Sequence, residues 1–83
     1  MIIMEEREIQ KGKWYKAKNK RSPARYVLYI SSDRQYVQYD GDEVRFGAKY
    51  PKRKMSAFLK WCGGIAKTDE QGYLVGNGHE EEE

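Results

Sequence analysis

The stretch RYVLYISSDRQYVQYDGDEVRFGA, residues 25–48, decides the fold. It contains three short runs in which apolar and polar residues alternate, and two turn signals separate them, which is the pattern of an antiparallel meander. The stronger signal is Asp40-Gly41, because a two-residue type I′ turn needs positive φ at both central positions and these residues tolerate it. We therefore expect strands at residues 25–31, 35–39 and 43–48.

Side chains alternate along a strand, so each expected strand has a core-facing set and an outward set. The core-facing set is Leu28, Ile30, Val37, Tyr39, Val44 and Phe46. The outward set is Arg25, Val27, Tyr29, Tyr36, Gln38 and Arg45, with Arg34 at the first turn. The meander is thus expected to carry cations and aromatic rings side by side on its outward face.

Residues 11–18, KGKWYKAK, predict another strand before the meander, entered through a glycine turn. Either Trp14 or Tyr15 is its inward ring, because a shift of one residue would exchange core and surface along the whole strand. The preceding residues 1–10 suit either a short strand or a frayed amphipathic turn, and the pattern does not decide between them.

The segment after the meander predicts a loop and then a helix. Residues 49–54, KYPKRK, are expected to form a basic loop that contains a proline. Ser56 is expected to cap a short helix at residues 57–62, and the Gly63-Gly64 pair is expected to end it. Residues 73–75 suit a last edge strand.

At 83 residues the chain is expected to form one domain with a small core, since so short a chain buries only about 60 to 65% of the surface that its unfolded form exposes. Phe58 lies three residues from Met55 and from Trp61, so one helix face can close the end of a barrel. The expected fold class is mainly β: a small SH3-like antiparallel barrel with one short helix near the C-terminus. Its expected parts are an N-terminal segment at 1–10, the barrel at 11–66, and an extension with an acidic tail at 67–83.

A GxWY start at Gly12, a central pair of hairpins and the segment MSAFLKW follow one another within residues 12–61. In this order they resemble the Tudor- and KOW-like small barrels seen in bacterial and phage proteins. The resemblance implies an SH3-like barrel that binds nucleic acid or protein. It carries over no role for any single residue.

The net charge of +3 is unevenly distributed along the chain. Residues 11–60 carry fourteen Lys and Arg against four acids, a net of +10, whereas residues 1–10 carry −2 and residues 61–83 carry −5. A basic body of this kind attracts phosphates or acidic protein surfaces. The acidic tail at 78–83 is expected either to be disordered or to fold back over the basic surface and compete with a polyanion at low salt.

The basic and tyrosine-rich surface predicts nucleic-acid binding, because aromatic rings stack on unpaired bases while interleaved cations neutralise the backbone. Tyr29 and Tyr36 are the stacking candidates. The predicted nucleic-acid contacts are Lys13, Lys16, Lys18, Arg21, Arg25, Tyr29, Tyr36, Arg45, Lys52 and Arg53. The alternatives are a solvated sheet face without a ligand, and a protein-interaction module or phage-type inhibitor that binds an acidic surface of a larger protein.

No catalytic, cofactor or metal site is expected. Cys62 is expected to be a small core residue, and the only histidine, His79, lies in the acidic tail, so the pair cannot form a zinc site. The lone cysteine forms no intramolecular disulfide, and no run approaches the roughly 18 apolar residues of a membrane span. We expect a non-enzymatic, soluble and cytoplasmic protein.

Overall fold

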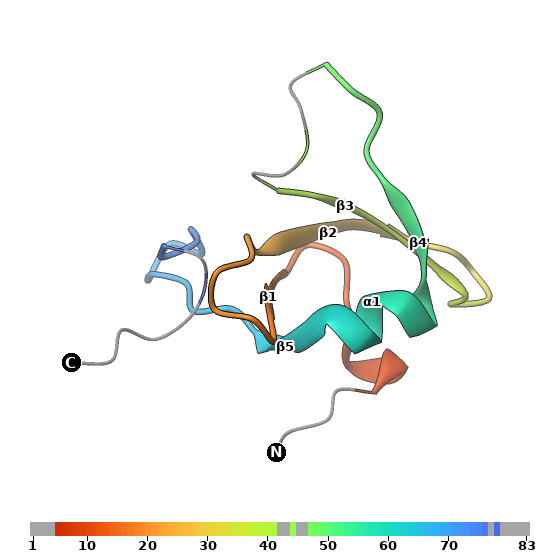
Figure 1. Ribbon diagram of the computed structural model, residues 1–83. Coiled ribbons are helices and arrows are strands. Elements are labelled where there is room, and N and C mark those ends of the chain that lie inside the picture. The colour runs from red at the N-terminus through yellow and green to blue at the C-terminus, as the bar shows by residue number, and fades with distance from the viewer. Residues whose placement is uncertain (1–4, 42–43, 45–46, 77, 79–83) are drawn as a thin grey trace.

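The computed structural model describes residues 5–41, 44, 47–76 and 78, and within them the chain is mainly β. Five antiparallel strands form one sheet in the order β4-β3-β2-β1-β5, which does not close on itself within the described residues. Figure 1 shows the one helix of this part of the chain lying across one side of the sheet. The elements in chain order are the 3-10 turn η1 (Glu6–Glu8), β1 (Trp14–Ala17), β2 (Arg25–Ile30), β3 (Tyr36–Asp40), β4 (Lys52–Lys54), α1 (Met55–Trp61) and β5 (Cys62–Ile65).

Phe58 of α1 lies at the centre of an aromatic core. Its ring is fully buried and contacts three others, with centroid distances of 5.9 Å to Tyr15, 6.1 Å to Tyr39 and 5.2 Å to Trp61. The Tyr15 contact is edge-to-face, an arrangement that aromatic pairs prefer. Met55, one helical turn before Phe58, is also buried, so the helix face predicted from the three-residue spacing is the face that packs on the sheet.

Tyr15 is the inward ring of β1. Its side chain is fully buried, whereas Trp14 is half-buried and packs against Tyr26 of β2 at a centroid distance of 5.2 Å. The Tyr15 hydroxyl donates to the Glu8 carbonyl at 3.0 Å and accepts from the Gln10 N–H at 2.8 Å. These two hydrogen bonds attach the end of η1 to the sheet. Residues 1–4, where a first strand was one possibility, lie outside the described residues.

A β-bulge in β2 overturns the predicted facing of Val27. Val27 pairs with Tyr39, and Tyr29 pairs with Gln38. From one pair to the next, the chain moves by two residues in β2 but by only one in β3, so Leu28 is the extra residue of the bulge. Val27 is therefore fully buried rather than outward, while Tyr29 remains 51% exposed. The strict alternation assumed from the sequence fails because a bulge shifts the facing by one residue. The inward facing of Val37 and Tyr39 in β3 is confirmed.

The described residues between β3 and β4 do not form the strand predicted at residues 43–48. β3 pairs with β4, the segment that the sequence had suggested to be a loop, and Val44, Gly47 and Ala48 are in no strand. Gly41 allows the backbone to approach the start of β2 closely. A Cβ at this position would lie 2.5 Å from the Ala24 carbonyl oxygen. The predicted positions of Glu43, Arg45 and Phe46 lie outside the described residues.

The helix also differs from its prediction. It begins at Met55, so Ser56 lies inside it, and the N-cap position is Lys54, which makes no side-chain capping hydrogen bond. The Gly63-Gly64 pair belongs to β5, where a Cβ on Gly63 would lie 2.7 Å from the Ala17 carbonyl oxygen. The helix therefore precedes the last strand and is not near the C-terminus. Residues 73–75 form no strand, only an isolated bridge between Leu74 and Thr68.

Candidate nucleic-acid interface

The outward side of β2, β3 and β4 carries the surface that best fits the predicted function. Tyr29 pairs with Gln38, and Gln38 in turn pairs with Lys52 of the edge strand β4. Tyr36 pairs with Lys54, so both lysines share the face of the two tyrosines. We call this surface the outer face, and it consists of Tyr29, Tyr36, Gln38, Lys52 and Lys54.

The two outer-face tyrosines are open to solvent. Tyr29 is 51% exposed and Tyr36 is 39% exposed, whereas Tyr39, three residues after Tyr36 in β3, is buried on the opposite side. Tyr29 is diagonal to Tyr36 across the β2–β3 pair, because Tyr36 lies two residues from its partner Gln38. Such diagonal positions are roughly 7 to 8 Å apart. Adjacent bases of a splayed single strand can therefore each contact one ring.

One lysine lies close to one of these rings. The Lys52 ammonium lies 5.0 Å from the centroid of the Tyr36 ring, within cation–π distance. The Gln38 amide donates to the Tyr50 carbonyl at 3.2 Å and so attaches the end of the β3–β4 connection to the sheet. This contact brings Tyr50, which is 47% exposed, to the margin of the outer face.

Arg25 does not lie on the outer face, contrary to the sequence prediction. Its guanidinium carbon is 4.3 Å from the Tyr39 ring centroid and 4.2 Å from that of Trp61, so the side chain points to the helix side of the sheet. The reason is that Arg25 is two residues before the buried Val27 and shares its facing. Arg45, another predicted contact, lies outside the described residues.

Arg34 is occupied in a structural contact. It takes a left-handed backbone conformation with φ of 58°, and its Nη2 donates to the Ile9 carbonyl at 2.7 Å. This hydrogen bond holds the N-terminal segment over the turn between β2 and β3. Arg34 therefore contributes to the fold rather than to the aromatic surface.

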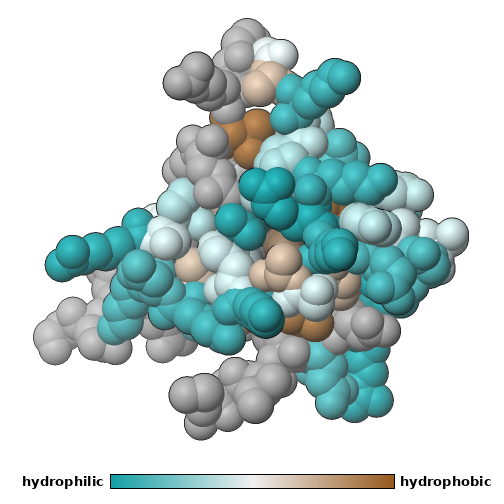
Figure 2. Space-filling view, turned by 45° about the vertical axis from the view of Figure 1, so that its right-hand side comes forward, coloured by the Kyte–Doolittle hydropathy of each residue, from teal (hydrophilic) through white to brown (hydrophobic). Residues whose placement is uncertain are grey.

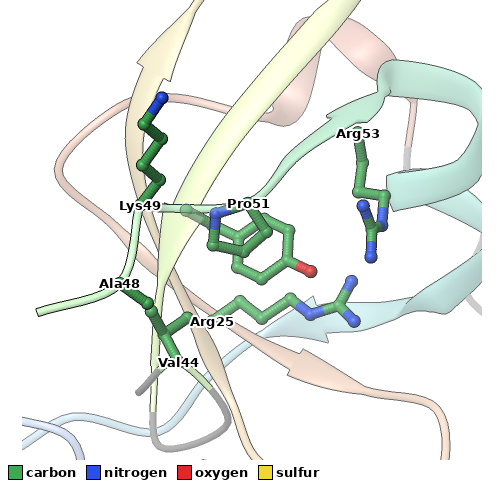
Figure 3. A pocket seen from close by; sticks show the side chains of 7 residues that line it. Arg25, Val44, Ala48, Lys49, Pro51 and Arg53 are labelled. Atoms are coloured by element: carbon green, nitrogen blue, oxygen red, sulfur yellow. The ribbon is translucent and has the colours of Figure 1, made fainter. Parts of the chain in front are cut away.

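The helix side of the sheet has a second basic feature, which we call the arginine pocket. It has a volume of about 400 Å³ and its described lining includes Arg25, Tyr39, Lys49, Pro51 and Arg53. Figure 3 shows the guanidinium groups of Arg25 and Arg53 directed toward the same space, while the Lys49 side chain extends away from them. Arg53 reaches this side because it alternates with Lys52 and Lys54 along β4.

The predicted contacts on β1 and its following loop form a separate group. Lys13, Lys18 and Arg21 are exposed and Lys16 is half-buried beside Gly64 of β5. Two strands separate β1 from β4 in the sheet, a distance of roughly 14 Å at ordinary strand spacing. The predicted basic residues therefore do not form one continuous patch.

Sequence reasoning missed Lys54 of the outer face and Tyr50 at its margin. Lys54 was assigned to a loop, although its alternation with Lys52 would place both on one face of any strand there. Tyr50 was counted only as part of a basic segment. The sequence could have indicated its exposure, because Tyr50 lies between Lys49 and Pro51 in a polar segment where an aromatic ring has few apolar neighbours to pack against.

The described residues contain one cysteine, Cys62. No cluster of three potential metal ligands occurs among them. The Cys62 thiol is buried, and burial raises its pKa, which disfavours the reactive thiolate. Burial likewise raises the pKa of the Tyr15 hydroxyl. Within the described residues no helix is long and apolar enough to cross a bilayer.

Among the coloured residues of the face seen in Figure 2, hydrophilic ones predominate and apolar ones appear only in small spots. Comparison with known proteins gave no match to a family model, a curated protein or a solved structure.

Proposed function

We propose that this protein is a small, non-enzymatic module that binds single-stranded nucleic acid on its outer face. The observation that carries the proposal is that two exposed tyrosines and two lysines share one side of three adjacent strands. The proposed fold is an SH3-like barrel. The sheet order β4-β3-β2-β1-β5, with a helix between β4 and β5, supports that assignment.

The energies favour base stacking over the existing cation–π contact. Lys52 over Tyr36 is exposed, and such a contact contributes about 0.5 to 1 kcal/mol. A base stacked on an aromatic side chain contributes about 1 to 3 kcal/mol. A base can therefore displace the ammonium from the ring, and the flexible lysine stem can then bring its charge to the neighbouring phosphate.

A duplex is the poorer ligand for this surface. Its bases are already stacked and paired, so the tyrosine rings would meet only the backbone. Lys52 and Lys54 would still neutralise phosphates, giving weak and strongly salt-dependent binding. We therefore expect preference for single strands and little preference among sequences.

Fluorescence anisotropy tests the proposal with labelled single-stranded and duplex oligonucleotides at several salt concentrations. Replacing Tyr29 and Tyr36 together by Ala should weaken single-strand binding by about 30-fold to 1,000-fold, if each ring contributes about 1 to 2 kcal/mol. The Tyr73→Ala variant is the matched control, since Tyr73 is 68% exposed and lies outside the sheet. Equal loss in the control, or no binding by the unmodified protein at low salt, would reject the proposal.

The second candidate is a protein-interaction module that binds an acidic partner, in the manner of a phage-type inhibitor. The observation in its favour is the exposed edge strand β4, which consists of three basic residues and offers both backbone and charge to a partner strand. The two candidates differ in salt dependence. Phosphate contacts weaken steeply as salt rises, whereas a packed protein interface retains much of its affinity.

A further inference from the structure

A second pair of aromatic rings, Trp14 and Tyr26, lies on the same side of the sheet as the outer face. Tyr26 pairs with Asp40, and Tyr29 pairs with Gln38. Asp40 and Gln38 are alternate residues of β3 and face the same side, so Tyr26 and Tyr29 share that side as well. Trp14 pairs with Tyr26 from the next strand, and their ring centroids are 5.2 Å apart. Aromatic rings therefore continue from the outer face across β2 to β1.

Trp14 also lines a pocket between the start of β1 and the residues that follow β5, which we call the tryptophan pocket. Its volume is about 210 Å³, and its described lining includes Lys13, Trp14, Ile65, Ala66 and Thr68. The half-buried indole and the 57% exposed Ile65 side chain give it apolar walls, and Thr68 adds a hydroxyl. Pockets for drug-sized ligands measure roughly 300 to 1,000 Å³, so this smaller one suits a single heterocyclic ring.

The charges around the tryptophan pocket suit a nucleic-acid strand. Lys13 lines the pocket and is exposed, and Lys16, two residues after Trp14, faces the same side of β1 as the indole. None of the described residues that line the pocket is acidic. Asp69 follows the lining residue Thr68, but its carboxylate accepts two backbone N–H groups of its own turn at 2.9 Å. A strand at this pocket therefore meets cations first.

We propose that the tryptophan pocket takes one base of the strand whose other bases lie on the outer face. This inference rests on the function proposed above and extends its site along the sheet. Tyr26 and Tyr29 are three residues apart in β2, a separation of roughly 10 Å, and Trp14 lies one strand further. A strand that reaches the pocket is therefore longer than one that covers the outer face alone. The additional base stacks on the indole, and Lys13 and Lys16 neutralise neighbouring phosphates.

The first test compares oligothymidylates of about four and about ten nucleotides, which lie within the site sizes known for small β folds. The unmodified protein should bind the longer strand at least about fivefold more tightly, the effect of one more stacked base. Ile65→Ala should lower this ratio by about threefold or more, because it removes apolar contact with the base. Ile65 is exposed, so the fold should tolerate the change. Tyr73→Ala is the matched control and should keep the ratio, since Tyr73 is exposed in the same C-terminal segment and does not line the pocket.

Tryptophan fluorescence reports on the pocket directly. The longer strand should quench the emission of the unmodified protein, whereas the shorter strand, which covers only the outer face, should not. The quenching should disappear in Trp14→Phe, which keeps a ring against Tyr26 and leaves Trp61 as the only tryptophan.

An unchanged affinity ratio in Ile65→Ala would overturn the inference, as would quenching that is absent with the longer strand or that persists in Trp14→Phe. Equal quenching by a hairpin duplex would also overturn it, because paired bases cannot enter the pocket. In each of these cases, binding of the shorter strand that depends on Tyr29 and Tyr36 would leave the proposed function intact. Failure of both strands to bind would reject both proposals.

Discussion

Removing the hydroxyl of Tyr15 should destabilise the fold without disturbing its core packing. In Tyr15→Phe the ring keeps its edge-to-face contact with Phe58, but the Glu8 carbonyl and the Gln10 N–H each lose a hydrogen-bond partner. A typical intramolecular hydrogen bond contributes about 0.5 to 1.5 kcal/mol, so we expect a total loss of about 1 to 3 kcal/mol. In a domain of this size the loss lowers the melting temperature by roughly 4 to 8 °C for each kcal/mol.

Urea denaturation followed by tryptophan fluorescence measures this loss. Tyr29→Phe is the matched control, because it removes a hydroxyl from an exposed side chain and should change the free energy of unfolding by less than about 0.5 kcal/mol. Amide hydrogen exchange at Gln10 should also become faster in Tyr15→Phe. A variant as stable as the unmodified protein, with an equally protected Gln10 amide, would refute the attachment of η1 through this hydroxyl.

Three further predictions concern stability and binding. Gly63→Ala should cost about 1 to 3 kcal/mol in the free energy of unfolding, because its Cβ would lie 2.7 Å from the Ala17 carbonyl oxygen; a calorimetric scan equal to that of the unmodified protein would contradict this. Burial raises the pKa of Tyr15 above 10.0, so the unfolded chain loses this proton at a lower pH than the folded chain does. The free energy of unfolding should therefore fall as pH rises above about 10, and it should fall less in Tyr15→Phe. Parallel curves of unfolding free energy against pH for the two proteins would contradict this. Lys52→Ala should reduce the slope of log affinity against log salt for single strands by about 0.7, and an unchanged slope would remove Lys52 as a phosphate contact.

The sequence predicted β2 and β3 because their pattern is local. Alternating apolar and polar residues with aromatic and β-branched side chains favour strands wherever the chain can pair them. The outward positions of Tyr29 and Tyr36 followed from this pattern and agree with the structure. The outward position predicted for Val27 does not agree with the structure. A bulge depends on how two strands pair, and nothing in the sequence of β2 alone reveals it.

β4 could not be predicted because its residues have no strand pattern. Lys52–Lys54 are three consecutive basic residues, and they form a strand since β3 offers them unpaired backbone groups at the sheet edge. Charged edge strands are also common as a protection against edge-to-edge aggregation. The position of the Arg25 side chain could not be predicted either, because its contacts with Tyr39 and Trp61 join residues that are far apart in the sequence.

The most direct test of the central claim is a titration of the isotope-labelled protein with a short single-stranded oligonucleotide, followed by NMR at backbone amides and tyrosine rings. We expect the largest shift changes on the outer face, at the Tyr29 and Tyr36 rings and at the amides of β4. Changes confined to β1, β5 or the residues after them, or the absence of any change at low salt, would contradict it. If β4 serves only to protect the sheet edge, the tyrosine rings will not respond.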